Sequence, residues 1–418
     1  MNILVVSSKY PPEYSGSGLR CHNTYIRLKK KYSINYKVLT SSVTENRNCK
    51  YKIDGVSVNR ISLKPFHSAY FLNYKSGKKI IDIPFRLAGK LFYRLDYFTE
   101  AFLTFVYLVR LRKWYDFIHM YGNVNVTAAV LTFSKIFNKK VLYEVVNFDD
   151  HKDYNPLAYY EPFFVRLIFG AGFKKNWKVI AISKILEELC HRHNPTINIV
   201  HRPNPVDELK FHPVSNQVKI SLRGELSKFS ESDVVIINIS KFIPRKNQIL
   251  IVDALKYLPK KYKLLMIGPL IKDGPLAERD FTYFKSINKL TKRLVLTDRV
   301  QIKTGFFDNV EKYFNLSDLF VFPTTDEAFG TPMLESFACA VPVVMAKIKG
   351  VSDVWIDDGV NGHLFKLDAK ELSEKILLSQ KLKKENLNRK SKEILDVAST
   401  AVIDKQYKKI FEKLIAGC

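Results

Sequence analysis

Short, strongly apolar runs alternate along this chain with longer segments in which apolar residues recur every three or four positions. The short runs are typical of buried strands and the longer segments of helices, which together predict parallel sheets covered by helices. The expected strands are 3–7, 37–40, 116–121, 140–145 and 178–182, followed by 234–240, 263–268, 300–304, 319–323 and 341–345. The expected helices are 17–31, 98–113, 125–137, 184–193, 248–258 and 332–339, with a lysine-rich helical region from about 377 onward.

The chain has 418 residues, and each half begins with its own buried strand, so two domains of roughly 200 residues are expected. A helix cannot cross the turn-rich sequence Arg202-Pro203-Asn204-Pro205, which marks the boundary. The predicted fold class is α/β, with two facing doubly wound Rossmann-like domains at 1–204 and 205–394. A C-terminal helical segment, 395–418, is expected to pack back toward the first domain. Ligands of such sheets bind beyond the carboxyl ends of the strands.

The formal net charge of +26 favours phosphate-bearing partners, although a lysine-rich composition spread over the surface explains it equally well. Five cysteines without a Cys-x-x-Cys pair indicate a reducing compartment. The chain starts on a strand rather than a signal peptide, and the most apolar run, 101–109, is too short to cross a bilayer. We expect a cytoplasmic protein that can contact the inner face of the cell membrane peripherally.

The most informative stretch runs from Pro323 to Glu335, where a strand ends, a loop follows and a helix starts. Pro332 suits the first helical position, with Thr331 as N-cap. Gly330 allows close backbone approach, and the amides of residues 330–333 are expected to bind a diphosphate. Glu327 and Glu335 could accept hydrogens from sugar and ribose hydroxyls, or could simply complement the helix dipole.

The spacing Glu327-x₇-Glu335, with Phe329-Gly330 inside it, resembles the signature of the retaining glycosyltransferases of family 4, which have the GT-B fold. The flanking sequences resemble the same family and extend the similarity over most of the chain; they are 11–18, 240–247, 303–307, 313–323, 340–344, 349–350 and 357–362. Asn204-Pro205-Val206-Asp207 resembles an interdomain element of the family, with Pro205 in place of glycine.

The resemblance implies a role for each matching residue. Gly16 would let backbone amides approach the donor phosphate, with Ser15 replacing the first of two customary glycines. Lys246, and Lys241 in place of the usual arginine, would bind the diphosphate, although a lysine lacks the bidentate fork. Glu327 would contact the transferred sugar and Glu335 the ribose. The remaining donor-site residues would be Phe306 beside the base, then Phe329, Gly330, Thr331 and Pro332.

The family often has a His-x-His pair after the fourth strand of the first domain, where this chain has His119-Met120-Tyr121. His119 matches the first histidine, and Tyr121 replaces the second, which lies near the reacting centre. Tyr121 either binds the sugar instead or marks a branch without that histidine. For His119 alone, a buried structural role is the stronger interpretation. By their match to the family's motifs, His119 and Tyr121 are nevertheless catalytic candidates, together with Glu327.

The resemblance further implies an enzyme of the hexosyltransferase type without a resident cofactor or metal, acting with retention. Its co-substrate would be a nucleotide-diphosphate-sugar, with UDP favoured over GDP, and its acceptor a saccharide or lipid-linked saccharide. The sequence contains no Asp-x-Asp and no His-x-x-x-His cluster. Lys241, Lys246 and the helix N-terminus would carry the leaving-group charge instead.

Three other classes of protein fit the sequence less well. A dinucleotide oxidoreductase is disfavoured because Cys21 stands where the third glycine of its fingerprint belongs. Nucleic-acid binding has only the net charge in its favour, so no nucleic-acid partner is expected. An inactive relative that acts as a membrane scaffold is possible, although Glu327, Glu335 and Lys246 are all present.

Residues 83–115 interleave cations with large apolar side chains, as interfacial amphipathic helices do. The cations are Arg86, Lys90, Arg94, Arg110, Arg112 and Lys113; the apolar residues include Phe85, Leu87, Leu91, Phe92, Tyr93, Phe98, Phe102, Phe105 and Trp114. Contact with an anionic membrane surface is one interpretation, and an ordinary helix burying its apolar face is the other.

Overall fold

A computed structural model describes residues 1–7, 9–13, 15–42, 46–66, 79–122, 127–146, 177–193, 195–272 and 276–416. Tyr14 of the predicted glycine loop, residues 125 and 126 of a predicted helix, and Cys418 lie outside the described residues. The chain divides into two compact units. The first unit comprises Met1–Arg202 and Asp404–Cys418, and the second unit comprises Pro203–Ile403. Each unit is built on its own sheet.

The first unit contains an eight-stranded sheet in the order β3-β4-β2-β1-β5-β6-β7-β8, parallel except for the antiparallel pair β3/β4. Its strands are β1 (Asn2–Ser7), β2 (Asn35–Thr40), β3 (Cys49–Ile53), β4 (Val56–Arg60), β5 (Phe117–Tyr121), β6 (Lys140–Val145), β7 (Trp177–Ala181) and β8 (Ile199–His201). Its helices are α1 (Gly16–Tyr32), α3 (Lys79–Leu111), α4 (Thr127–Phe137), α5 (Lys184–His193) and most of α14 (Thr400–Ala416).

Strands β1, β2, β5, β6 and β7 confirm the predicted strands to within two residues at each end. The prediction for helix 98–113 was wrong at its start, because α3 begins at Lys79 and continues through Pro84. None of the described helices combines the length and the hydropathy that crossing a bilayer requires.

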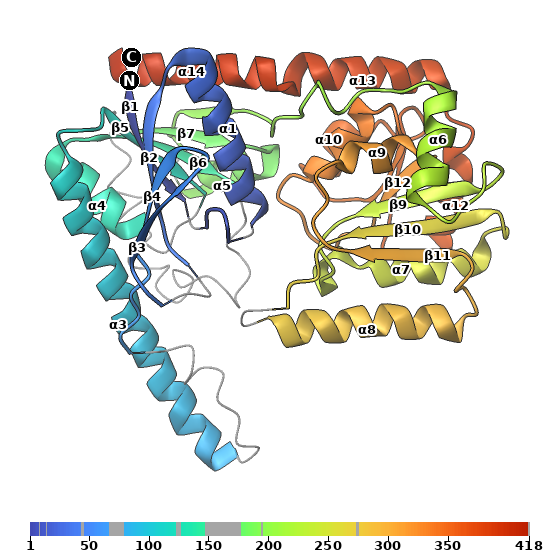
Figure 1. Ribbon diagram of the computed structural model, residues 1–418, viewed down its shortest axis with the longest axis horizontal. Coiled ribbons are helices and arrows are strands. Elements are labelled where there is room, and N and C mark those ends of the chain that lie inside the picture. The colour runs from blue at the N-terminus through green and yellow to red at the C-terminus, as the bar shows by residue number, and fades with distance from the viewer. Residues whose placement is uncertain are drawn as a thin grey trace. The chain divides into compact units, whose positions relative to one another are not determined.

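The second unit contains a six-stranded parallel sheet in the order β11-β10-β9-β12-β13-β14, which is a doubly wound topology. Its strands are β9 (Val234–Ile239), β10 (Tyr262–Gly268), β11 (Val300–Thr304), β12 (Leu319–Phe322), β13 (Val343–Ala346) and β14 (Gly362–Phe365). Its helices are α6 (Asn216–Leu226), α7 (Gln248–Ala254), α8 (Ala277–Arg293), α9 (Val310–Asn315), α10 (Thr331–Ala338), α11 (Ser352–Trp355), α12 (Ala369–Ser379) and α13 (Lys384–Ala398), with two short 3₁₀ turns, Pro244–Lys246 and Leu255–Tyr257. Helices cover both faces of this sheet (Figure 1).

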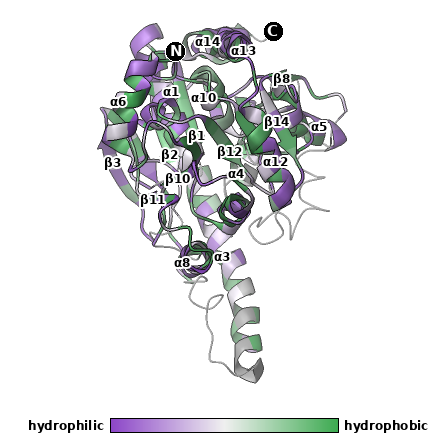
Figure 2. Cartoon of the chain, turned by 90° about the vertical axis from the view of Figure 1, so that its right-hand side faces the viewer, coloured by the Kyte–Doolittle hydropathy of each residue, from purple (hydrophilic) through white to green (hydrophobic). Residues whose placement is uncertain are grey.

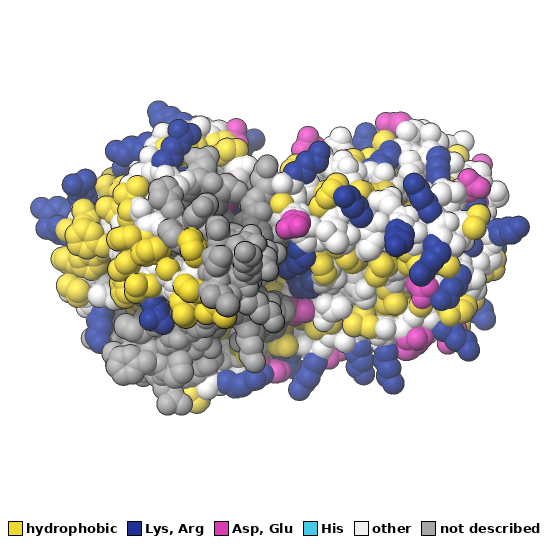
Figure 3. Space-filling view, turned by 90° about the horizontal axis from the view of Figure 1, so that it is seen from below, with side chains coloured by type: hydrophobic (Ala, Val, Ile, Leu, Met, Phe, Trp, Pro, Cys, Tyr) yellow, Lys and Arg dark blue, Asp and Glu magenta, His cyan; other side chains and the backbone are white. Residues whose placement is uncertain are grey.

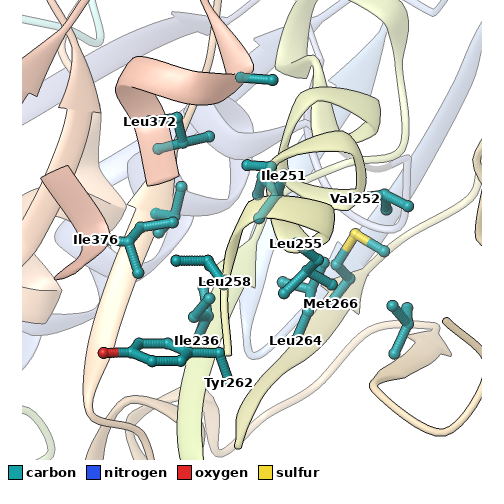
Figure 4. Packing of buried hydrophobic residues seen from close by; sticks show 14 of the residues in the cluster. Ile236, Ile251, Val252, Leu255, Leu258, Tyr262, Leu264, Met266, Leu372 and Ile376 are labelled. Carbon is teal, nitrogen blue, oxygen red and sulfur yellow. The ribbon is translucent and has the colours of Figure 1, made fainter. Parts of the chain in front are cut away.

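One apolar cluster fixes α7 against the second sheet. Ile236, Leu264 and Met266 project from β9 and β10 toward Ile251 on α7, while Leu372 and other residues of α12 close the same core (Figure 4). The strands carry the hydrophobic residues that lie inside the molecule, as the hydropathy colouring shows (Figure 2). Because α7 and β9 both pack into this core, the loop at 240–247 that connects them is anchored at both ends.

Candidate active site

Two loops meet at the carboxyl edge of the second sheet. Strands β9 and β12 are hydrogen-bonded neighbours, so the loops that follow them emerge side by side. The amide of Thr325 donates to the carbonyl of Arg245 over 2.9 Å, and the hydroxyl of Thr324 donates to the same carbonyl over 3.2 Å. These bonds join the loop at 240–247 to the loop at 323–330, where ligands of such sheets bind.

The joined loops bring Lys246, Arg245 and Glu327 together. The ammonium of Lys246 forms an ion pair with Oε2 of Glu327, and Nη1 of Arg245 lies 3.7 Å from the same oxygen. Arg245 also donates to the Asp326 carbonyl over 2.6 Å. Burial would raise the pKa of Glu327, but Lys246 and Arg245 outweigh it and lower that pKa. Glu327 is therefore an ionised, oriented carboxylate at neutral pH.

Local backbone geometry explains why the first loop holds its shape. Gln248, buried at the start of α7, donates from its side-chain amide to the Lys241 carbonyl and to the Ser240 hydroxyl, each over 2.9 Å. Gly268 has φ +152°, and a Cβ there would lie 2.1 Å from the Ser240 carbonyl oxygen. Only glycine at the end of β10 lets the β9 loop approach this closely.

Helix α10 starts differently from the sequence prediction. Gly330, with φ 81°, is the N-cap, so the assignment of Thr331 as N-cap was wrong. Glycine adopts this left-handed conformation without steric cost, and Thr331 is already helical; Pro332 follows it within the first turn. The hydroxyl of Thr331 accepts a hydrogen bond from the side chain of Asn204 over 2.8 Å.

The anion site at this helix start is smaller than the sequence predicts. Pro332 has no N–H, and the Met333 amide donates to the Gly330 carbonyl over 2.9 Å. Within the described part of the chain, the amides of Gly330 and Thr331 donate to no protein acceptor. Two amides, rather than four, are thus available to a ligand.

Glu335 lies half-buried on the first turns of α10. Burial, with a smaller contribution from Glu311, raises the pKa of Glu335 to about 7. Phe329 is buried and meets Trp355 edge-on with ring centroids 6.2 Å apart, so it serves as packing for the loop. Phe306 follows Gly305, which has φ +148°, and its side chain is exposed, as a surface contact to a planar ligand requires.

Lys241 lies on the same loop as Lys246 but has a different neighbour. Its ammonium lies 3.8 Å from the buried carboxylate of Asp280, on α8. Asp280 also accepts from Arg279 over 2.8 Å. Among the described residues, no group of three or more His, Cys, Asp and Glu side chains is arranged to hold a metal ion.

In the first unit, His119 and Tyr121 lie on β5 with both side chains fully buried. The Tyr121 hydroxyl accepts a hydrogen bond from Nε of Arg20 over 2.9 Å, and the Tyr25 hydroxyl lies 2.6 Å from Nδ1 of His119. Burial lowers the pKa of His119, against the attraction of Glu144, and raises the pKa of Tyr121 to about 12. Both residues are therefore neutral at physiological pH.

Beneath them lies a buried charged network that sequence reasoning missed. Nη2 of Arg202 lies 2.8 Å from Oε1 of Glu144, and the Tyr407 hydroxyl donates to Oε2 of Glu144 over 2.6 Å. Arg202 in turn donates to the Tyr407 hydroxyl over 2.6 Å. Burial would raise the pKa of Glu144, but Arg202 and His119 hold it at about 2. The network connects β6 and α14 with Arg202, the last residue of the stretch Met1–Arg202.

The glycine loop of the first unit places its steric requirement on Gly18 rather than Gly16. A Cβ on Gly18 would lie 2.3 Å from the Lys9 carbonyl oxygen, whereas one on Gly16 would meet nothing within 4 Å. Ser15 caps α1 by accepting from the Gly18 amide over 2.9 Å. Gly16 lies exposed at the helix start, so its backbone is accessible to a ligand.

Two further residues of the candidate site in the second unit stand within the sequence motifs, but the sequence assigns them no role. Arg245 contacts Glu327 and Asp326, and Asn204 binds Thr331. Their only signal in the sequence is position: Arg245 directly precedes Lys246, and Asn204 opens the interdomain element.

Solved structures with the same architecture define the fold class as GT-B. HepE from Anabaena, in complex with UDP and glucose, is similar over 99% of this chain and 100% of its own, with TM-score 0.70 and 17% identity. Sucrose-phosphate synthase from Thermosynechococcus elongatus is similar over 100% of both chains, with TM-score 0.73 and 17% identity.

Sequence comparison places part of the chain in a family. Residues 225–394 match the model of the glycosyl transferases group 1. N-acetyl-alpha-D-glucosaminyl L-malate synthase of Bacillus anthracis is 31% identical over 224 residues, which are 52% of this chain. The match spans about half of that relative's own length, 53%. Residues 225–394 therefore form a group 1 glycosyltransferase domain, within a chain whose fold is GT-B.

Proposed function

We propose that this chain transfers a sugar from a nucleoside-diphosphate sugar to a hydroxyl of a saccharide acceptor, with retention at the anomeric carbon. The observation that carries the proposal is the cluster of Lys246, Arg245 and Glu327 beside the start of α10. It combines cations suited to a diphosphate with an ionised carboxylate suited to sugar hydroxyls.

In this proposal the leaving diphosphate binds to Lys246, Arg245 and the amides of Gly330 and Thr331, with Lys241 contributing from the same loop. The bond between the anomeric carbon and the phosphate oxygen breaks while the acceptor oxygen bonds to the same face of the sugar. The phosphate oxygen takes the acceptor proton. Preorganised cations stabilise the charge that develops on the leaving group. Glu327 holds the transferred sugar.

The other donor contacts follow from their positions. Glu335 accepts the two ribose hydroxyls, and Phe306, exposed after Gly305, lies against the base. Structures of Anabaena HepE hold UDP and UDP-glucose, so UDP-sugars are the first donors to test. Gly16, open at the start of α1, remains a candidate contact to the donor phosphate.

His119 and Tyr121 take a different part. Because both side chains are fully buried, we assign them to supporting β5 rather than to direct contact with the reacting sugar.

We propose a saccharide or lipid-linked saccharide acceptor, in the assembly of a cell-surface polysaccharide or glycolipid. The basic composition suits such a setting, since anionic surfaces attract a chain of net charge +26.

The test is nucleotide release from a panel of UDP-, GDP- and ADP-sugars, combined with thermal shifts for each. A matched donor should stabilise the fold, because only the folded state binds it. Glu327→Ala should abolish turnover, and Lys256→Ala, an exposed lysine paired with Asp253, should leave it unchanged. Absence of a shift with every donor would refute the proposal. A shift without turnover would identify an inactive relative.

A further inference from the structure

Helix α3 carries a row of exposed apolar side chains, with the exposed Arg94 between Leu91 and Phe98. The row, called here the α3 stripe, consists of residues spaced four or seven positions apart, each 55–66% exposed: Ile83, Leu87, Leu91, Phe98 and Phe102. This spacing places them along one side of the helix over roughly 30 Å. Large apolar residues scattered singly need no explanation, whereas an aligned row indicates an interaction surface.

The charged side chains that the structure describes on α3 are sorted by sign. Asp96 and Glu100 are buried, and Asp96 accepts a hydrogen bond from the amide of Phe66 over 2.9 Å. The exposed charged side chains that the structure describes on this helix are Arg94 and Arg110. The side chains of Lys79, Asp82, Arg86 and Lys90 lie outside the described residues. The described outer surface of the helix therefore presents apolar and cationic groups only.

Other apolar side chains are exposed on segments that pack against α3. Phe66 stacks on Phe92 with ring centroids 5.9 Å apart and is itself partly exposed, as is Leu63. At the other end, Ile136 is exposed on α4 and the Arg112 guanidinium lies 5.8 Å from the ring centre of Phe137. Figure 3 shows hydrophobic side chains gathered on this side of the first unit, with Lys and Arg side chains around them.

We propose that the α3 stripe docks on the surface of an anionic lipid bilayer. Exposed apolar side chains accompanied by Arg94, with Asp96 and Glu100 buried, match acyl chains beneath negatively charged headgroups. A second copy of this chain fits less well, because each copy has a net charge of +26 and like charges repel. α3 continues past the sheet of its own unit, so the stripe is presented on a projecting helix (Figures 1 and 2).

The test is co-sedimentation with vesicles of phosphatidylcholine alone or mixed with phosphatidylglycerol, at low and high salt. The chain should bind the anionic vesicles at least tenfold more tightly than the neutral ones, and less tightly as salt rises. Phe98→Ser combined with Phe102→Ser should reduce binding at least tenfold. The matched control is Leu209→Ser with Val295→Ser, which removes two side chains of the second unit that are 86% and 84% exposed. That control should bind like the unchanged chain.

Three results would overturn the proposal: no vesicle binding at low salt, unchanged binding by the Phe98/Phe102 variant, or a dimer in gel filtration that this variant dissociates. Far-UV circular dichroism establishes that each variant is folded. Membrane binding is a property separate from sugar transfer. Nucleotide release measured in vesicle-free buffer therefore tests transfer independently of membrane binding. A chain that releases nucleotide without binding vesicles refutes only the membrane surface.

Discussion

Lys246 and Glu327 form an ion pair although they are 81 positions apart in the chain. Glu327 thereby has a cationic partner within the protein itself. A diphosphate carries more negative charge than one carboxylate, so it competes for the same ammonium. We therefore expect donor binding to change this ion pair.

Lys246→Ala should weaken binding of the matched nucleotide about 10- to 100-fold, which corresponds to one lost charge-assisted bond of about 1.5–3 kcal/mol. The loss should exceed that of Lys246→Arg, which keeps the charge. Calorimetric titration with the nucleotide measures both. Lys256→Ala, which breaks an exposed pair with Asp253, is the control and should bind normally. Equal affinity in Lys246→Ala and the control would remove Lys246 from the donor site.

Nucleotide affinity should rise with pH between 6 and 8. The pKa of Glu335 is raised to about 7, so the carboxyl is mostly protonated at pH 6 and mostly ionised at pH 8. Only the ionised form accepts both ribose hydroxyl hydrogens, and affinity should therefore change by up to about tenfold. Glu335→Gln cannot titrate, and its titration curves should be flatter than those of the unchanged chain. A parallel pH dependence in both proteins would assign the effect to the nucleotide itself.

Gly268→Ala should destabilise the second unit by about 2 kcal/mol or more, because φ +152° is strained for alanine and its Cβ would overlap the Ser240 carbonyl. Nucleotide binding should weaken together with stability, since Ser240 belongs to the loop at 240–247 that carries Lys241 and Lys246. Gly224→Ala is the matched control. A Cβ there meets nothing within 4 Å on helix α6, so it should stabilise by about 0.5–1 kcal/mol. Thermal unfolding distinguishes the two.

Tyr407→Phe should lower the stability of the first unit by about 1–3 kcal/mol, because it removes a hydroxyl bonded to both Arg202 and Glu144 in a buried site. Tyr257→Phe, on an exposed side chain, is the control and should change little. Denaturant unfolding followed by a probe in each unit would show where the loss falls. An equal loss in both variants would contradict a buried network.

The elements that sequence reasoning found are those with apolar runs. Strands β1, β9, β10, β12 and β13 are buried, and their Val, Ile, Leu and Phe content predicts them directly. The hairpin β3/β4 was missed because Cys49-Lys50-Tyr51-Lys52-Ile53 alternates lysine with larger groups on an edge strand. Helix α3 was truncated because Pro84 and Gly89 are signals for a helix boundary.

The sequence proposes members of the candidate site but not the contacts between them. Glu327, Lys246 and Gly330 follow from motif spacing, whereas the ion pair depends on the approach of two loops after β9 and β12. The N-cap was wrong because Thr331 has the better side chain for capping, and the φ of 81° at Gly330 decides the geometry instead. The buried network of Glu144, Arg202 and Tyr407 joins segments up to 263 positions apart, which no local pattern contains.

The first unit is assembled from two separate stretches of chain, Met1–Arg202 and the stretch that begins at Asp404. On the ribosome, domains usually fold as units from the N-terminus onward. Here Glu144 and Arg202 must wait for Tyr407, which emerges about 200 residues later, at roughly 10–40 s for ordinary elongation rates. The second unit, encoded without interruption, is therefore free to fold before the first is complete. Translation stalled before residue 404 would leave a finished second unit joined to an unfinished first one.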